Sequence, residues 1–198
     1  MNPMRRCTPV VVLLTCAALA ACGPDAAEST SDHTRVNAYI TGYSYFDNTP
    51  PGSSHISNPV LRTVAGGTGT YDDPTTVAVG HVRSGGDDEL DWPEGTRFYV
   101  PNLRRYLIVE DTCGDGADPQ DGPCHTGYPD DADTWLDVWI GGEGGTAREA
   151  RRCMDSITGV WTVLVDPGPG LATRPGPIYQ PGRCTPVFGD EVVTADEG

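Results

Sequence analysis

The sequence predicts an exported, mostly β domain that is stabilised by disulfides. Six short segments rich in β-forming residues are bounded by glycine, proline, aspartate or asparagine, and one further segment has the pattern of a helix. Four cysteines lie in the part of the chain that follows the N-terminal leader and the cysteine at its end. Together these observations predict one all-β domain with one short helix, long Gly/Pro loops and two disulfides.

Residues 1–21 have the pattern of a secretory signal peptide. Arg5 and Arg6 precede the apolar run CTPVVVLLTCAALAAC, which is too short to span a membrane and ends in small residues. The sequence Leu19-Ala20-Ala21-Cys22 resembles the bacterial lipobox, whose cysteine is diacylated and becomes the first residue of the mature protein. The resemblance implies a lipid anchor at Cys22 and an extracytoplasmic location on a bacterial membrane, inner or outer. The alternative is an ordinary cleaved signal peptide with an accidental cysteine.

The remaining chain has the length of one domain. Residues 22–34 lack apolar periodicity and predict a flexible tether, residues 35–188 form the expected domain, and residues 189–198 are expected to be a disordered tail.

Acidic residues dominate the composition. The chain has 28 acids and 13 bases, all of them arginine, and a formal charge of −15 that falls to −17 when Arg5 and Arg6 are removed with the leader. Such a surface repels nucleic acid and anionic lipid headgroups, so we expect no nucleic-acid partner. Most of these carboxylates are read as a solvated surface.

Strands are predicted at residues 36–40, 75–79, 97–100, 106–110, 135–140 and 160–165. The helix is predicted over AREARRCMDSI, because Thr146 can cap it, Glu149 completes a capping box, and Gly159 ends it. Long loops are predicted at residues 47–70, 83–95, 112–134 and 166–183, a feature of binding loops or disulfide-held segments.

The four cysteines of the expected domain predict disulfides rather than a metal site. Cys113, Cys124, Cys153 and Cys184 allow three pairings, of which we favour the nearest neighbours, Cys113 with Cys124 and Cys153 with Cys184. There is no Cys-x-x-Cys pair, and an exported chain meets oxidising conditions, so zinc is disfavoured and no metal or other cofactor is expected.

The segment TWLDVWIGG carries a carboxylate between two indoles. In a strand, Leu136 and Val138 share one face, and Trp135, Asp137 and Trp139 share the other. Indoles stack on the apolar faces of sugar rings, and a carboxylate between them can bind hydroxyls or deliver a proton, with its pKa raised by the aromatic neighbours. The alternative is that both tryptophans belong to a packed layer and the acid caps a turn.

The segment YLIVEDTCGDG ends a strand in an acid beside a cysteine. Alternation places Asp111 on the face of Leu107 and Val109, so it is expected to be partly buried. A buried acid must be paired, hydrogen-bonded or neutral, and the amide of Thr112 or Cys113 could satisfy it.

Two weaker patterns of candidate site residues are also present. Asp115, Asp118 and Asp121 hint at calcium but lack the spacing of a known calcium loop, and Tyr43, Tyr45 and Asp47 form a second aromatic and acidic cluster. The nucleophile-elbow, phosphate-loop and His-Glu-x-x-His motifs are absent, which disfavours hydrolysis by a triad or by zinc.

Taken together, GTRFYVPNLRRYLIVEDTCGDG and the later WLDVWIGG resemble the double-psi β-barrel superfamily of expansins, barwin, rare lipoprotein A and family 45 endoglucanases. The resemblance spans residues 36–165 and implies a six-stranded double-psi β-barrel. It implies a general acid at Asp137 and a supporting acid at Asp111. Tyr45 and Asp47 match the tyrosine and the general base of the endoglucanases more weakly. Asp115 is a weak match to the loop acid of the same enzymes. The chain lacks the dense N-terminal cysteines of those enzymes, and it has longer loops than rare lipoprotein A.

These expectations converge on a monomer that acts on a polysaccharide such as peptidoglycan or a cellulose-like glycan. As an enzyme, a glycoside hydrolase or lytic transglycosylase, it would use Asp137 to protonate the glycosidic oxygen. As a non-catalytic, expansin-like module it would bind the glycan through Trp135, Asp137 and Trp139. A barwin-like structural or inhibitory barrel is the third reading, since fold alone does not fix function.

Overall fold

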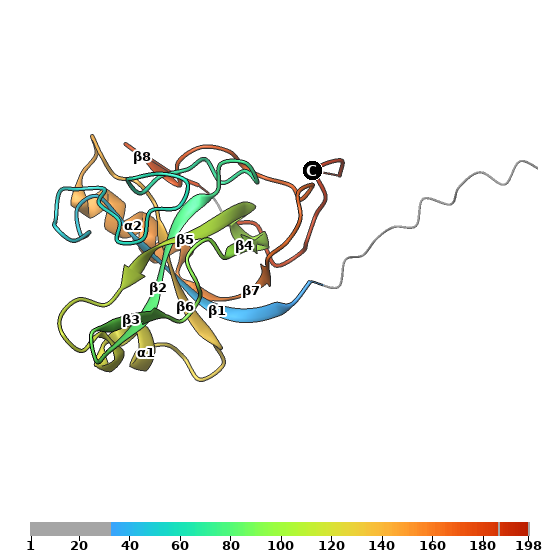
Figure 1. Ribbon diagram of the computed structural model, residues 1–198. Helices are drawn as coiled ribbons and strands as arrows, with labels where there is room; N and C mark the ends of the chain where they lie inside the picture. Colours follow the sequence, from blue (N-terminus) through green and yellow to red (C-terminus); the bar gives the residue numbers. More distant parts are fainter. Residues whose placement is uncertain (1–32, 186, 198) are drawn as a thin grey trace, which may run out of the picture. The chain divides into compact units, whose positions relative to one another are not determined.

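Six strands close into a β-barrel (Figure 1) in the computed structural model, which describes residues 33–185 and 187–197. Around the barrel the order is β2, β5, β4, β7, β1 and β6, and β6 pairs back to β2. All six predicted strands are confirmed, most of them longer than predicted. Their bounds are β1 Arg35–Tyr43, β2 Thr75–Ser84, β4 Arg97–Val100, β5 Arg105–Cys113, β6 Thr134–Trp139 and β7 Gly159–Val165.

The barrel interleaves the two halves of the chain. The first half supplies β1, β2 and β4, and the second half supplies β5, β6 and β7. Among the described residues, every ladder of the barrel joins a strand of one half to a strand of the other: β1 lies between β6 and β7, β2 between β5 and β6, and β4 between β5 and β7. The pairs β1–β6 and β2–β5 are parallel, and the other four are antiparallel.

Alternate residues of the strands fill the barrel, because successive side chains of a strand point to opposite faces. Leu136 and Val138 of β6 are fully buried in this core, as the sequence predicts. The other fully buried strand residues of the core include Ala38, Ile40, Val77, Val79, Phe98, Val100, Leu107, Val109 and Val163.

Helix α2 (Ala147–Ile157) has the predicted bounds and covers part of β1. The Glu149 amide donates to Thr146 Oγ1 at 3.3 Å, so the N-cap is confirmed. The Glu149 side chain returns to the Thr146 hydroxyl, which donates to Oε2 at 2.8 Å, rather than to the Thr146 amide that a capping box uses. A Cβ at Gly42 would lie 3.2 Å from Met154 and from Ile157, so a larger residue where the helix crosses β1 would require these side chains to shift by a few tenths of an ångström.

The structure has a second helix, which the sequence analysis missed. Helix α1 (Pro123–Thr126) is a single turn that begins at a proline, too short to produce a helical period in the sequence. Its Cys124 forms a disulfide with Cys113 at the end of β5, and Cys153 of α2 forms one with Cys184. Two disulfides with the nearest-neighbour pairing are therefore confirmed.

Strand β3 (Asp87–Leu90) corrects the prediction of a loop over residues 83–95. It forms a hairpin with β2, which runs five residues beyond the predicted end. Gly85 and Gly86 have φ of 64° and 98°, as a two-residue hairpin turn requires. The segment DDEL has low strand propensity, so only the pairing with β2 explains the strand. Figure 1 shows β3 and α1 at the same end of the barrel.

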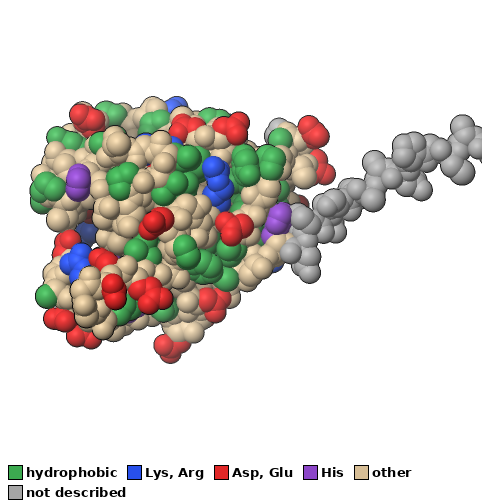
Figure 2. All heavy atoms as spheres, in the orientation of Figure 1, with side chains coloured by type: hydrophobic (Ala, Val, Ile, Leu, Met, Phe, Trp, Pro, Cys, Tyr) green, Lys and Arg blue, Asp and Glu red, His purple; other side chains and the backbone are tan. Residues whose placement is uncertain are grey.

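The chain after β7 packs along the barrel. Strands β8 (Tyr179–Gln180) and β9 (Arg183–Cys184) form a short hairpin. The segment 189–198 was expected to be disordered, but the Ala172 amide donates to the Val193 carbonyl oxygen and the Ala195 amide to that of Gly170, both at 2.8 Å. None of the helices in the described part of the chain is long and apolar enough to cross a membrane. On the face shown in Figure 2, acidic side chains are widespread and basic ones are few.

Candidate functional site

Four neighbouring strands bring the two principal acids into one row. Ala78 of β2 pairs with Asp111 of β5 on one side and with Asp137 of β6 on the other. Asp137 in turn pairs with Thr41 of β1. Because neighbouring strands lie about 4.8 Å apart, the Cα atoms of the two aspartates are roughly 10 Å apart, separated by one alanine.

A β-bulge decides which face Asp111 occupies. Val77 pairs with Val109 and the next residue, Ala78, pairs with Asp111, so Glu110 is an extra residue in β5. A bulge reverses the alternation beyond it. The prediction that Asp111 shares the face of Val109 is therefore wrong: Val109 points into the barrel, while Asp111 lies on the outer face with Ala78.

The extra residue is itself held by a buried polar network. The Glu110 side chain is fully buried, and its Oε1 accepts from the amides of Leu61 and Arg62 at 2.7 and 3.2 Å. Its Oε2 accepts from Arg62 Nη1 at 2.8 Å and from Thr76 Oγ1 at 3.0 Å. These contacts tie the loop before β2 to the bulge and fix the register at the site.

A pocket of about 360 Å³ opens over this row of residues. Four aspartates line it, namely Asp47, Asp111, Asp115 and Asp137, all of which the sequence analysis named. The remaining lining residues are Tyr43, Asn48, Thr49, His55, Ser57, Ala78, Arg83, Thr112, Cys113, Gly114 and Gly116.

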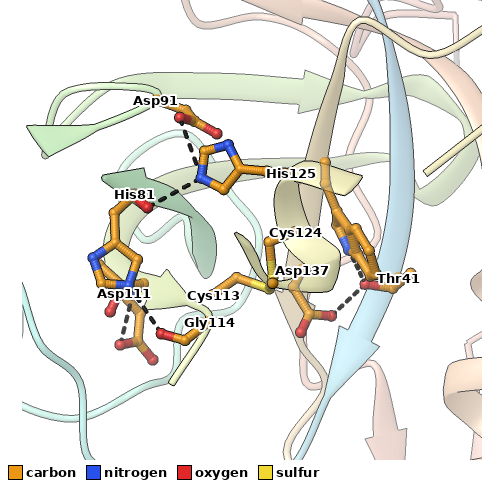
Figure 3. Close-up of a disulfide and its surroundings, with 12 residues drawn as sticks. Thr41, His81, Asp91, Asp111, Cys113, Gly114, Cys124, His125 and Asp137 are labelled. Atoms are coloured by element: carbon orange, nitrogen blue, oxygen red, sulfur yellow. Dashed lines mark hydrogen bonds and ion pairs between the residues drawn. A yellow bond between two sulfur atoms is a disulfide. The ribbon is translucent and has the colours of Figure 1, made fainter. Parts of the chain in front are cut away.

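Asp137 is the acid whose proton is most strongly held. Burial raises its pKa to about 7, and the nearby carboxylates of Asp47 and Asp111 add to the rise. Thr41 Oγ1 donates to Asp137 Oδ1 at 2.5 Å and accepts from Trp135 Nε1 at 2.6 Å. This short chain, drawn in Figure 3 at Thr41, fixes one carboxyl oxygen, while Oδ2 accepts no hydrogen bond from the described residues.

Asp111 is held by four hydrogen bonds. Its Oδ1 accepts from the Ser57 amide at 3.0 Å, from Ser57 Oγ at 2.9 Å and from the Thr112 amide at 2.9 Å. Its Oδ2 accepts from the Tyr43 hydroxyl at 2.9 Å. Burial, followed by the charge of Asp111, raises the pKa of Tyr43 well above its usual value, so Tyr43 remains a donor. The expected partial burial and the amide contact from Thr112 are both present.

The other two acids lie on the exposed rim. Asp47 Oδ1 accepts from the amide and hydroxyl of Ser44 at 2.8 and 2.6 Å, and its Oδ2 accepts no hydrogen bond from the described residues. Asp115 Oδ2 accepts from Thr49 Oγ1 at 3.0 Å. Asp47 therefore offers the pocket an oriented carboxylate with one oxygen available.

The loop after β5 is anchored from β2 by two basic side chains. His81 is fully buried, and its Nε2 lies 2.9 Å from the Gly114 carbonyl oxygen (Figure 3). Its Nδ1 lies 2.5 Å from Asp88 Oδ1. Each ring nitrogen therefore contacts one oxygen, and the two contacts fix the orientation of the ring. The hydrogen bond from His81 lowers the pKa of Asp88. Arg83 Nη1 donates to the Gly116 carbonyl oxygen at 2.7 Å, so the loop that carries Asp115 is fixed twice.

Three residues named from the sequence do not line the pocket. Trp139 is 8% exposed and packs edge-on against Tyr43, with ring centroids 5.1 Å apart. Trp135 packs against Tyr39 and uses its indole N–H on Thr41. Tyr45 packs against Phe46.

Several residues of the site escaped the sequence analysis. Thr41 lies 96 residues from Asp137, and no local pattern marks it as a partner. Ser57 lies in the long loop 47–70, whose length was the only available signal, while nothing in the sequence singled out His81 or Arg83. Cys22, the expected lipid attachment site, lies outside the described residues.

Metal-ligand geometry is absent from the described part of the chain. There, no group of three His, Cys, Asp or Glu side chains is arranged to hold a metal ion, and this includes the Asp115, Asp118 and Asp121 loop.

Residues 35–185, well over half of the chain, match the model of a family described as the DDB_G0273701 N-terminal domain. The chain belongs to this family. A relative from Dictyostelium discoideum, the uncharacterized protein DDB_G0273701/DDB_G0273221, is 32% identical over 114 residues. The aligned part is 57% of this chain and 43% of the relative, so the match spans less than half of that protein. No solved structure matches the chain.

Proposed function

We propose that this member of the DDB_G0273701 N-terminal domain family is a double-psi β-barrel that cleaves a polysaccharide outside the cell, with Asp137 as the general acid. The barrel topology supports the fold type. Two series of three strands have equivalent pairings, namely β1, β2, β4 and β5, β6, β7. The first strand of each series pairs in parallel with the second strand of the other: β1 with β6, and β5 with β2. Such an interleaved repeat is what two crossed psi motifs would produce.

The observation that carries the proposal is the pKa of Asp137. A general acid must hold its proton near the working pH and release it in the transition state. At a pKa of about 7, Asp137 is substantially protonated in neutral solution, and it lines the pocket with Oδ2 free of hydrogen bonds from the described residues. An exposed aspartate with a pKa near 3.8 would hold almost no proton there.

Asp47 is the candidate general base. In a hydrolase, Asp137 protonates the leaving glycosidic oxygen, the C1–O bond breaks, and water attacks C1 as it gives a proton to Asp47. Inversion requires carboxyl groups about 6.5–9.5 Å apart. Asp111, which accepts four hydrogen bonds, adds to the rise in the pKa of Asp137 and orients the wall of the site. If Asp47 proves dispensable, a sugar hydroxyl can replace water, as in a lytic transglycosylase.

The proposed location is extracytoplasmic, with a lipid anchor at Cys22 and a glycan as partner. The two disulfides support an oxidising compartment. Peptidoglycan and a cellulose-like glycan are the two substrates to test, and the acidic surface favours a ligand without phosphate.

The test is incubation of residues 30–198, with disulfides intact, with purified peptidoglycan or cellulose. Soluble fragments are expected from the wild type and a loss of at least 100-fold from Asp137→Asn, since general acid catalysis contributes about 10²–10⁴. Asp155→Asn, an exposed aspartate on α2, is the matched control and should retain activity. If the protein sediments with the glycan but releases no soluble fragments, it is an expansin-like binding module and not an enzyme. Neither cleavage nor sedimentation would end the glycan proposal.

A further inference from the structure

A second pocket, which shares no lining residue with the acidic one, is basic. It has a volume of about 390 Å³, and three of the 13 basic residues of the chain line it, namely Arg105, Arg174 and Arg183. None of the described residues that line it is acidic, although the chain has 28 acids. The other lining residues are Pro175, Gly176, Pro177, Gln180, Cys184 and Thr185.

Arg105, the first residue of β5, is buried to an extent unusual for an arginine. Its residue is 1% exposed, and it is the largest of the fully buried side chains. Gly69 covers it: a Cβ at Gly69 would lie 2.8 Å from Nη1 and 2.9 Å from Cγ of Arg105. The loop before β2 therefore needs a glycine so that the guanidinium can occupy this place.

The guanidinium is only partly satisfied. Nη1 donates to the carbonyl oxygens of Thr68, at 2.9 Å, and Gly176. Nη2 makes one long hydrogen bond, 3.4 Å, to Thr185 Oγ1, and the buried Nε–H has no acceptor among the described residues. Nε and Nη2 share one edge of the guanidinium, and this is an edge that binds a carboxylate or phosphate through two parallel hydrogen bonds.

No carboxylate balances this charge. No ion pair of Arg105 is present among the described residues, and burial alone lowers its pKa to about 10. A buried cation without a counter-charge is costly, and an anion that enters the site would offset that cost.

The other two arginines lie at the exposed rim. Arg183 Nη2 donates to Gln180 Oε1 at 3.2 Å, which keeps it beside the pocket. The Arg174 amide donates to the Arg104 carbonyl oxygen at 2.9 Å, which fixes the backbone of the segment. In a protein of net charge −15, this local positive field can draw in an anion that the rest of the surface repels.

We propose that this pocket binds a small ligand through an oxyanion group, a carboxylate, phosphate or sulfate, held by the Nε–Nη2 edge of Arg105 and screened by Arg174 and Arg183. The volume exceeds that of a lone oxyanion, so the group belongs to a larger molecule. The site does not depend on the acids of the first pocket, so it stands or falls separately from the proposed glycan cleavage.

Inorganic phosphate, sulfate and acetate, each against chloride at matched ionic strength, are the probes. The wild-type protein is expected to show a saturable rise in Tm with at least one of them, and the Arg105 Nε–H resonance should shift over the same concentration range. The double variant Arg174→Gln/Arg183→Gln should raise the apparent Kd at least tenfold. Arg148→Gln/Arg151→Gln, two exposed arginines of α2, removes the same charge elsewhere and should leave the Kd unchanged.

Arg105→Lys keeps the charge but removes the two-donor edge, and it should abolish the saturable response if it folds. If Arg105→Lys does not fold, the Arg174→Gln/Arg183→Gln variant and the Arg105 Nε–H resonance of the wild type still test whether the pocket binds the anion. Equal loss of binding in the two double variants would reduce the site to diffuse charge attraction. The absence of a saturable response to all three probes would overturn the proposal, and an unmoved Nε–H signal would remove Arg105 from it.

Discussion

The raised pKa of Asp137 makes the stability of the fold depend on pH. Its folded-state pKa of about 7 exceeds the usual 3.8, so folding takes up a proton between these values. The stabilising contribution is complete below about pH 4 and is lost as the pH rises through 7. Above pH 7 the folded state carries a charge that its surroundings oppose, at a cost of up to about 4 kcal/mol before solvent screening.

Asp137→Asn is therefore expected to be more stable than the wild type at pH 8, by about 1–4 kcal/mol, and no more stable at pH 4. Urea unfolding at the two pH values measures this difference. The control Asp155→Asn should show the same small effect at both. A gain for Asp137→Asn that does not depend on pH would mean that this carboxyl titrates normally.

Thr41→Val is expected to raise the pKa of Asp137 further. The Thr41 hydroxyl is the group that lowers this pKa, because its hydrogen bond favours the ionised carboxyl. An NMR titration of the Asp137 carboxyl carbon gives the value directly. Thr162→Val, on the neighbouring strand β7, serves as the control. A lower pKa in Thr41→Val would show that the hydroxyl instead accepts from a protonated Asp137.

Single residues were predictable where a local pattern marks them. Asp47, Asp111, Asp115 and Asp137 stood out beside aromatic residues or at strand ends, and all four line the pocket. The tryptophans share the alternation of Asp137 but pack against tyrosines, and alternation cannot separate an outer packed layer from a binding face. Thr41 and Ser57 reach the site only through long-range pairing.

At the scale of elements, the bulge in β5 sets the site. Glu110 and Arg62 hold it through an ion pair, Arg62 Nη1 to Glu110 Oε2 at 2.8 Å, in which the Glu110 side chain is fully buried and the Arg62 side chain is 16% exposed. Breaking a buried pair from one side leaves an uncompensated charge and costs about 3–5 kcal/mol.

Arg62→Met is accordingly expected to lower the free energy of unfolding by about 3–5 kcal/mol. Adding Glu110→Gln to it should restore part of the loss, because no buried charge then remains. Urea unfolding of the two single variants and the double variant forms the cycle. Simple additivity of the two losses would argue against coupling between Arg62 and Glu110.

Strands and the helix α2 were predictable because period-2 alternation, flanking turn residues and a capping box are local signals. The bulge was not predictable, because the apolar and polar residues of YLIVEDTC fit a regular strand as well as a bulged one. The acidic strand β3 was missed for a related reason: its order comes from pairing with β2, and its own residues favour a loop.

At the scale of the whole molecule, the two halves of the barrel depend on each other. Among the described residues, no two barrel strands of the same half pair with each other. A chain divided in the 3-10 turn Pro101–Leu103 gives a piece with β1, β2, β3 and β4 and a piece with β5 to β9 and both disulfides.

Each piece alone is expected to lack a cooperative unfolding transition, and an equimolar mixture to recover the β-sheet circular dichroism of the intact chain. The intact protein, and a mixture of either piece with an unrelated β protein, are the controls. A cooperative transition in one isolated piece would contradict the dependence between halves.

Barrel closure lay beyond the sequence, because pairing of β1 with β6 and β7 joins segments about 100 residues apart. The resemblance of two short segments gave the strand number and order of the acids. The resemblance did not predict the register of the strand pairs, which places Ala78 between Asp111 and Asp137.

The interleaving also sets when folding can start. Both neighbours of β1, namely β6 and β7, are the last strands of the barrel to be made, and β7 ends at Val165. At about 5–20 residues per second, the ribosome needs several seconds after β1 emerges before its partners exist. During that interval the nascent chain lacks the strands that close the barrel. A chain of this topology therefore cannot complete its barrel before β7 has been synthesised.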